Sequence, residues 1–170
     1  MKKITIVDYG SGNVLSAQKS FIKIAKDNNI EVDVLISKKL NDVKNSTHIV
    51  LPGQGAFSTC MNGLEKTHGL IDELCEFALI KKKPFLGICV GMQVLANQGF
   101  EFGKHDGLGW VEGKVNKLKA KMLPHIGWNN ISIKKNSEIF SNLGNYKDFY
   151  FVNSYAFIPK NEEHIIAETD

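Results

Sequence analysis

The sequence predicts an α/β protein with a doubly wound, mostly parallel sheet and flanking helices, and three observations carry this prediction. Short apolar runs alternate with segments of helical periodicity, as in β-α-β units. Glycine-rich turns follow two of these runs, as they do at the ligand-binding edge of such sheets. The nearly all-apolar run at residues 84–88 is typical of a central parallel strand covered on both faces.

The N-terminal elements follow from their residue patterns. Residues 3–8 are a strand-like run, and apolar residues then recur at helical spacing over residues 14–25. Residues 31–37 alternate as a second strand, and residues 48–51, ended by a Pro-Gly pair, indicate a third. These patterns predict the strand and helix order of a doubly wound sheet.

The remaining elements complete the sheet and add a β-rich part. Apolar residues on one face predict a helix over residues 70–79, which precedes the strand at 84–88. After about Gly107 the sequence becomes β-rich, with one short helix near residues 137–143. Because no internal repeat or linker interrupts the chain, residues 1–170 are expected to form one domain.

Composition excludes several classes of protein. Of 170 residues 43% are hydrophobic, which favours a buried core over intrinsic disorder. All 21 basic residues are lysines and the net charge is only +3, so nucleic-acid binding is not expected. No apolar run approaches the roughly 20 residues of a membrane-spanning helix, and no signal-peptide core follows Met1. A cytoplasmic protein with free thiols is expected, Cys60 and Cys75 being buried ones.

A G-x-C-x-G motif carries the strongest chemical signal. Cys89 stands between Gly87 and Gly91 where a strand is expected to meet a helix, which indicates a nucleophile elbow with cysteine as the nucleophile. The glycines remove β-carbons that would collide with a strained backbone. The helix N-terminus is expected to lower the pKa of the thiol, and the Val90 N–H to face a developing oxyanion. The plain alternative is an ordinary buried cysteine.

A second glycine-rich turn, Pro-Gly-Gln-Gly at residues 52–55, follows the third strand. The carboxyl ends of parallel strands share one edge, so this turn is expected beside Cys89. A peptide N–H at Gly53 or Gln54 would then complete an oxyanion hole with that of Val90. From these residues alone, an ordinary turn remains an open alternative.

Six segments, in order along essentially the whole chain, resemble the glutaminase subunits of imidazole glycerol phosphate synthase. These subunits are triad-type, class I glutamine amidotransferases of histidine biosynthesis. The segments are DYGSGN (8–13), LPGQGAF (51–57), GICVGMQVL (87–95), GLGWVEGKV (107–115), LPHIGWN (123–129) and YFVNSY (150–155).

The resemblance implies that the elbow cysteine hydrolyses glutamine to glutamate and ammonia through a thioester. The ammonia then passes to a (βα)₈-barrel cyclase subunit in a heterodimer. Because the sequence has no metal-ligand cluster and no phosphate-binding P-loop, no metal or organic cofactor is expected. Gln93 and the backbone of Ser154 and Tyr155 would hold the glutamine, while Gly53 and Gln54 would supply the second oxyanion donor. As plain alternatives, Gln93 would be a helix-surface residue and the Ser-Tyr pair part of a strand.

The resemblance also implies a partner interface. Its residues would be Asn13, His125, Trp128, Asn129 and Asn153. Trp128 is equally compatible with a packing role, since aromatic residues mostly serve the core. The family usually has histidine at the position of Asn153, and neutral asparagine cannot carry its charge. This departure favours, as a second hypothesis, a paralogue that delivers ammonia to a sugar amidotransferase of surface-polysaccharide synthesis.

A further departure concerns the catalytic base. In the family a histidine and a glutamate come from an H-P-E motif near the C-terminus, and this sequence has no such motif. None of its histidines, at positions 48, 68, 105, 125 and 164, stands in a convincing setting for a base. The chain is therefore expected to lack the last strands of the fold and to have negligible turnover. Three hypotheses remain: a glutaminase subunit, a non-catalytic binding subunit, and a cysteine hydrolase unconnected with glutamine.

Overall fold

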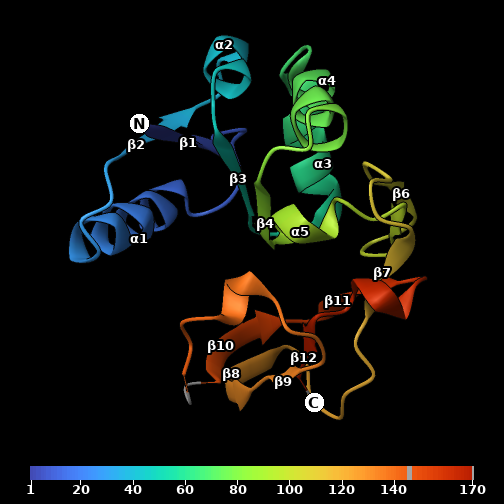
Figure 1. Cartoon of the computed structure of the whole chain (residues 1–170). Helices are drawn as coiled ribbons and strands as arrows, with labels where there is room; N and C mark the ends of the chain where they lie inside the picture. The colour runs from blue at the N-terminus through green and yellow to red at the C-terminus, as the bar shows by residue number, and fades with distance from the viewer. Residues whose placement is uncertain (145–146, 170) are drawn as a thin grey trace.

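The structure, a computed structural model, describes residues 1–144 and 147–169, and its N-terminal part is the expected parallel sheet (Figure 1). The strand order is β2-β1-β3-β4, and all three pairings are parallel. The strands are β1 (Lys2–Val7), β2 (Val32–Ser37), β3 (His48–Gly53) and β4 (Phe85–Cys89). Because the chain passes from β1 outward to β2 and then back to β3, the loops after β1 and β3 meet at the switch point where such folds bind ligands.

Helices cover both faces of this sheet. Right-handed crossovers require α1 (Val14–Asp27) to lie on one face and α2 (Leu40–Lys44) on the other, as Figure 1 shows. The connection from β3 to β4 contains α3 (Phe57–Lys66) and α4 (Leu70–Cys75), which continues into a π-helical turn. The predictions at residues 14–25 and 70–79 are confirmed, whereas α2 and α3 were not predicted.

The prediction of a central strand at residues 84–88 is wrong for the described part of the chain. β4 pairs with β3 on one side and forms the edge of the four-stranded sheet. Its burial is correspondingly incomplete, with Ile88 37% exposed. An apolar run predicts a strand that is buried on both faces. It does not show whether the strand has a hydrogen-bonded neighbour on both sides.

The larger apolar core explains why α3 takes its position. Phe57, Cys60, Met61 and Leu64 are buried at spacings of three and four residues, so one face of α3 packs on the sheet. Leu51 of β3 belongs to the same cluster. This packing fixes the N-terminus of α3 directly after the Pro-Gly-Gln-Gly turn.

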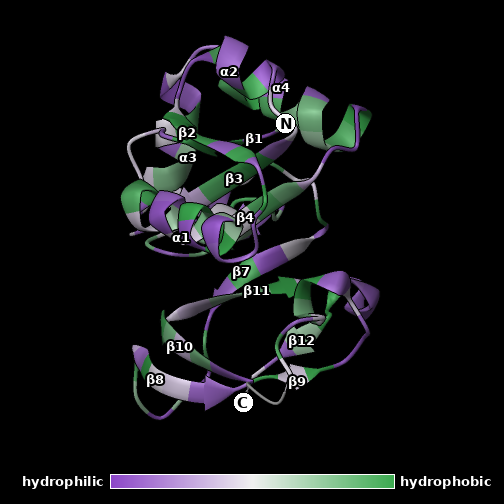
Figure 2. Cartoon of the chain, turned by 60° about the vertical axis from the view of Figure 1, so that its left-hand side comes forward, coloured by the Kyte–Doolittle hydropathy of each residue, from purple (hydrophilic) through white to green (hydrophobic). Residues whose placement is uncertain are grey.

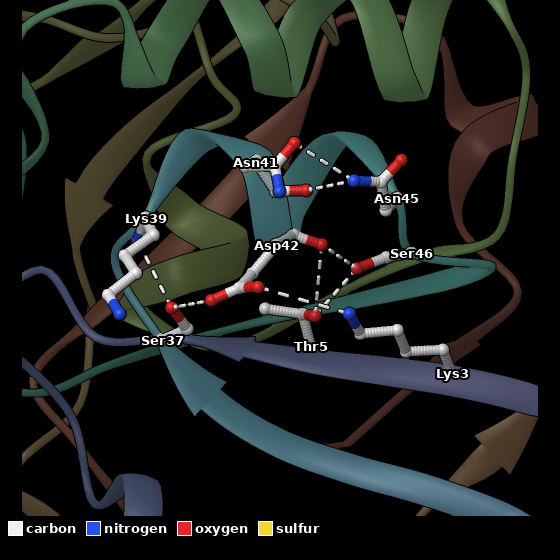
Figure 3. Close-up of polar contacts among 8 residues, drawn as sticks. All are labelled: Lys3, Thr5, Ser37, Lys39, Asn41, Asp42, Asn45 and Ser46. Carbon is white, nitrogen blue, oxygen red and sulfur yellow. Dashed lines mark hydrogen bonds and ion pairs between the residues drawn. The ribbon is translucent and has the colours of Figure 1, made fainter.

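A buried polar network holds α2 against the sheet (Figure 3). Ser46 Oγ lies 2.6 Å from Thr5 Oγ1 of β1, and both residues are almost fully buried. Ser37 of β2 donates a 2.6 Å hydrogen bond to Asp42 Oδ2 of α2. Three elements are thereby joined through groups that would be costly to bury without partners.

The chain is β-rich after about Gly107, as predicted, and short strands begin already at residue 98. One mixed sheet has the order β11-β7-β5-β6, and two antiparallel pairs join β8 to β10 and β9 to β12. Figures 1 and 2 place β7 and β11 between the helix-covered sheet and the β8–β10 pair. The strands are β5 (Gln98–Gly99), β6 (His105–Asp106), β7 (Gly113–Lys117), β8 (His125–Asn130), β9 (Ser132–Ile133), β10 (Asp148–Asn153), β11 (Tyr155–Pro159) and β12 (Ala167–Glu168). The short helix expected near 137–143 is a 3₁₀ turn, Glu138–Phe140.

Among the described residues, no helix is both long enough and apolar enough to cross a membrane.

Candidate active site

Cys89 lies on a strained turn between β4 and the short helix α5 (Val90–Gln93), as the elbow motif predicts. Its backbone has φ 54° and ψ −120°, which a residue with a β-carbon rarely adopts. A β-carbon at Gly91 would lie 1.8 Å from the Leu51 carbonyl oxygen, and one at Gly87 would lie 2.6 Å from the Met92 Cα. Both glycines are therefore required by close packing around the elbow, and the side chain of Cys89 is exposed.

The expectation of a lowered thiol pKa is wrong in this structure. Although Cys89 is exposed as a residue, desolvation of its thiol is the largest effect and raises the pKa above the ordinary value of 9.0. A hydrogen bond from the Val90 N–H acts in the opposite direction, and Cys60 raises the pKa again. A four-residue helix places few aligned peptides behind the sulfur, so its dipole does not outweigh desolvation.

The other two cysteines differ in burial. Cys60 is fully buried, as expected, but Cys75 is only partly buried because it lies at the end of α4. All three cysteines are free thiols.

The Pro-Gly-Gln-Gly turn lies beside Cys89, as predicted. Gly53 is the register partner of Cys89 in the β3–β4 pair, so the two backbones are separated by about 4.8 Å. A β-carbon at Gly53 would lie 2.2 Å from the Gly91 nitrogen and 2.7 Å from the Val90 carbonyl carbon. Only glycine permits this approach.

The N–H of Gln54, however, does not point toward Cys89. It donates to Ser11 Oγ at 3.2 Å, and Ser11 follows β1. Since β1 and β4 flank β3 on opposite sides, this N–H is directed to the side away from the thiol. Of the two N–H groups expected as the second oxyanion donor, at Gly53 or Gln54, the one at Gln54 is thus occupied by Ser11.

The loop after β1 contacts the turn through several further groups that sequence reasoning missed. Tyr9 donates a 2.7 Å hydrogen bond to the Pro52 carbonyl oxygen, and burial raises the pKa of the Tyr9 phenol, which keeps this donor protonated. A β-carbon at Gly12 would lie 2.8 Å from the Pro52 carbonyl carbon. Beyond the turn, Glu101 accepts a 2.9 Å hydrogen bond from the Phe57 N–H. The DYGSGN segment was the sequence signal for the contacts of Tyr9 and Gly12, and no pattern signalled the contact of Glu101.

The structure brings together the residues expected to hold glutamine. Gln93, which is 7% exposed, donates a 3.0 Å hydrogen bond to the Tyr155 carbonyl oxygen. Asn153 donates to the same oxygen at 3.3 Å, and its own Oδ1 is buried without a partner in the structure. The Ser154 carbonyl accepts from the Leu118 N–H. Gln93 lies one helical turn, about 6 Å, beyond Cys89, which suits a small substrate spanning the two.

The residues expected at a partner interface lie on more than one surface. Trp128 is 72% exposed, and β8 pairs it with the exposed Tyr150 of β10. His125 points to the other face of this pair, where it stacks on Phe151, and Asn129 and Asn153 alternate onto that face with it. Asn13 is exposed and caps α1 by accepting from the Ser16 N–H. His125 and Asn13 therefore already have contacts within the chain.

No histidine is among the groups that influence the Cys89 pKa in the described residues. His48 begins β3 at the end opposite Gly53, about 16 Å away at the rise of a strand. Nor does any cluster of three or more histidine, cysteine, aspartate or glutamate residues suit a metal ion in this part of the chain.

Comparison with known proteins agrees with the elbow geometry. The family "Glutamine amidotransferase class-I" matches residues 5–170. The "Imidazole glycerol phosphate synthase subunit HisH" of Pelagibacter ubique is 46% identical over 98% of this chain and 81% of its own length. The protein of that name from Rhodospirillum rubrum is 37% identical over 99% of this chain and 81% of its own length. The chain belongs to the HisH family of class I glutamine amidotransferases.

Solved structures support the amidotransferase fold independently. A crystal structure of a glutamine amidotransferase matches this HisH-family chain with a TM-score of 0.69 at 14% identity, over 96% of this chain and 78% of the other. A second, from Thermotoga maritima, gives a TM-score of 0.55 at 18% identity over 94% and 64% of the two chains. The predicted fold class is confirmed.

Proposed function

We propose that the protein is the glutaminase subunit of imidazole glycerol phosphate synthase, acting in histidine biosynthesis in the cytoplasm as one amidotransferase domain. The single observation that carries the proposal is the strained Cys89 elbow, one strand spacing from Gly53 and one helical turn from Gln93. HisH-family membership supports it, since the relatives are named as subunits of that synthase.

The proposed chemistry follows from this arrangement. The Cys89 thiolate attacks the side-chain amide carbon of glutamine, so a C–S bond forms and the amide oxygen becomes negative. The Val90 N–H and a second N–H at Gly53 or Gln54 would stabilise that oxygen, the one at Gln54 only when it no longer donates to Ser11. Collapse breaks the C–N bond and releases ammonia once the nitrogen is protonated. Water then cleaves the thioester to give glutamate and the free thiol.

Substrate binding is assigned to the cluster around the Tyr155 carbonyl. Gln93, about one helical turn beyond Cys89, would hold the part of glutamine remote from the thiol together with Ser154 and Tyr155, since Gln93 bonds the Tyr155 carbonyl oxygen. The substrate is free glutamine, and no cofactor takes part in the proposed reaction.

The proposed partner is a cyclase subunit with a (βα)₈ barrel, bound as a heterodimer. The exposed face of β8 and β10 supports this assignment. Ile126 and Val152 are each 57% exposed, and they flank the exposed Trp128 and Tyr150. Exposed apolar patches of this kind mark protein interfaces, and Trp and Tyr are enriched among the residues that dominate binding. Asn13 would add a polar contact from the loop after β1.

These 170 residues are proposed to have negligible glutaminase turnover. No histidine is among the groups that shift the pKa of Cys89 in the described residues, and loss of triad members commonly costs several powers of ten in rate. Without a base, the thiol proton is not removed efficiently and water is not activated to clear the thioester.

Asn153 supports a second candidate function, a paralogue that delivers ammonia to a sugar amidotransferase. Its Oδ1 is buried with no partner among the described residues, beside the proposed glutamine site, where the family usually has histidine. The HisH names of the relatives favour the histidine pathway over this alternative.

Glutamate release tests the proposal. We expect the 170-residue chain to release essentially none, and a version extended by a downstream H-P-E segment to be active and stimulated by the cyclase subunit. In the extended chain, Cys89→Ala is expected to abolish release while leaving cyclase binding intact. Robust glutamate release by the 170-residue chain would show that it has a catalytic base and would refute the proposed negligible turnover. Stimulation of glutamate release by a sugar amidotransferase instead of the cyclase would favour the alternative partner.

A further inference from the structure

β11 is the edge strand of the mixed sheet, and its first residue, Tyr155, turns its backbone to the open side. The Leu118 N–H donates to the Ser154 carbonyl oxygen, which makes these two residues a hydrogen-bonded pair that continues the register of β7 and β11. In an antiparallel ladder the next residue directs its N–H and C=O away from the neighbouring strand. In the described part of the chain, no strand pairs with that side of β11. The Tyr155 carbonyl is therefore held by side chains and not by a sheet.

Two side-chain amides fill the two lone pairs of this carbonyl oxygen. Gln93 of α5 donates to it at 3.0 Å, and Asn153, the last residue of β10, donates at 3.3 Å. Each amide is thereby fixed in one orientation, since a reversed amide would set oxygen against oxygen. The Tyr155 carbonyl thus joins the helix that follows Cys89 to the end of β10.

The orientation of the Asn153 amide has a cost in stability. With its Nδ2 bonded to the Tyr155 carbonyl, its Oδ1 is buried and has no partner among the described residues. Buried acceptors are rarely left unpaired, because such a group loses its hydrogen bonds to water and gains none in return. Leucine, an apolar side chain of the same shape, would avoid this cost. The stability of the fold therefore does not explain an asparagine at this position.

We propose that Asn153 is a positioning residue for glutamine binding, which acts through the Tyr155 carbonyl to hold Gln93 and the Tyr155 backbone in their binding orientation. The inference rests on the proposed glutaminase function, in which Gln93 and Tyr155 hold the substrate. Without the Asn153 amide, the Tyr155 carbonyl keeps only the bond from Gln93. Both groups then have more freedom to rotate, and the substrate must order them when it binds, which lowers its affinity.

Protection of Cys89 by glutamine measures binding at this site without requiring turnover. The chain is labelled with iodoacetamide at increasing glutamine concentrations, and mass spectrometry follows the modification of Cys89. The glutamine concentration that halves the labelling rate reports the affinity, and the rate without glutamine reports the reactivity of the thiol itself. Urea denaturation of the same proteins measures their free energy of unfolding.

Asn153→Leu is expected to weaken glutamine protection about threefold to tenfold, the effect of losing one neutral hydrogen bond. The same variant should be at least as stable as wild type, because leucine removes the unpaired buried oxygen. Asn153→His should bind glutamine nearly as well as wild type, since the imidazole Nδ1 takes the place of the asparagine Nδ2 next to Cγ and can carry the donated hydrogen. Asn116→Leu is the matched control, because it makes the same exchange on β7, opposite Ala156, and it should leave glutamine protection unchanged.

Equal glutamine protection in wild type and Asn153→Leu would overturn the proposal. An Asn153→Leu protein that is unfolded or less stable than wild type would overturn it as well, because Asn153 would then have an ordinary structural role. An equal loss of protection in Asn116→Leu would show a general effect and not one of position. A failure of the proposed function gives a different result: glutamine would then not slow the labelling of wild-type Cys89 at any concentration, and the inference about Asn153 would fail with it.

Discussion

The N–H of Gln54 donates to Ser11 at 3.2 Å, on the side of β3 that faces away from Cys89. The residue before it, Gly53, is nevertheless the register partner of Cys89. The backbone of Gly53 is therefore fixed beside Cys89, whereas the backbone of the next residue, Gln54, is held by the loop after β1. This relationship makes the loop after β1 part of the site.

Selective labelling should identify Cys89 as the reactive thiol. A glutamine-analogue electrophile is expected to modify Cys89 in preference to Cys60, which is fully buried, and to Cys75, which lies away from the turn on α4. Mass spectrometry of peptides after limited labelling measures the three sites. Equal modification of all three would contradict the elbow assignment.

The pH dependence of alkylation should show the effect of desolvation on Cys89. Because burial raises the thiol pKa, the thiolate fraction near neutral pH is smaller than for a free cysteine. The rate of iodoacetamide labelling should therefore keep rising through pH 9.0, with a midpoint above that of an unstructured cysteine peptide. A midpoint below the peptide's would instead indicate a thiolate stabilised by α5.

Gly91→Ala should disrupt the elbow. Its β-carbon would lie 1.8 Å from the Leu51 carbonyl oxygen, so β3 and α5 must separate. We expect a loss of more than about 3 kcal/mol in unfolding free energy, measured by urea denaturation. Gly144→Ala is the control: φ is +56° there, but the space is open, and left-handed strain alone costs about 1–2 kcal/mol. Equal losses would mean that the close approach at Gly91 can relax.

Ser46→Ala should destabilise the sheet by about 1–3 kcal/mol, because it removes the close partner of the buried Thr5 hydroxyl. Asn45→Ala alters the neighbouring exposed residue, whose side chain bonds only Asn41, and should change the unfolding free energy by less than about 0.5 kcal/mol. Thermal or urea unfolding measures both. A neutral Ser46→Ala would show that Thr5 finds another partner.

Trp128→Ala should weaken cyclase binding without affecting the fold. The side chain is 72% exposed, so its removal opens no large cavity, yet an aromatic anchor in an interface is commonly worth about 2 kcal/mol or more. Calorimetric titration should then show at least about a tenfold loss of affinity. Phe102→Ala removes an 85% exposed ring from the loop between β5 and β6 and serves as control. Equal affinities for wild type and Trp128→Ala would exclude this face from the interface.

Some elements of this structure could be predicted from the sequence, and others could not. The parallel sheet, the strained cysteine and the glycines around it follow from local patterns, because a buried strand and a tight turn each restrict which residues fit. Helix α3 was missed although its apolar spacing is regular, since serine, threonine and glycine interrupt it. The edge position of β4 was also missed.

The sequence by itself determined the position of the elbow cysteine, which we propose as the nucleophile, and the edge of the sheet where it lies. Only the tertiary structure decided the pKa direction of Cys89 and the orientation of the Gln54 N–H. The first depends on how much protein surrounds the sulfur, and the second on a hydroxyl 43 residues away in the chain. Desolvation and long-range hydrogen bonds arise from atoms brought together by folding, so no local residue pattern encodes their sign.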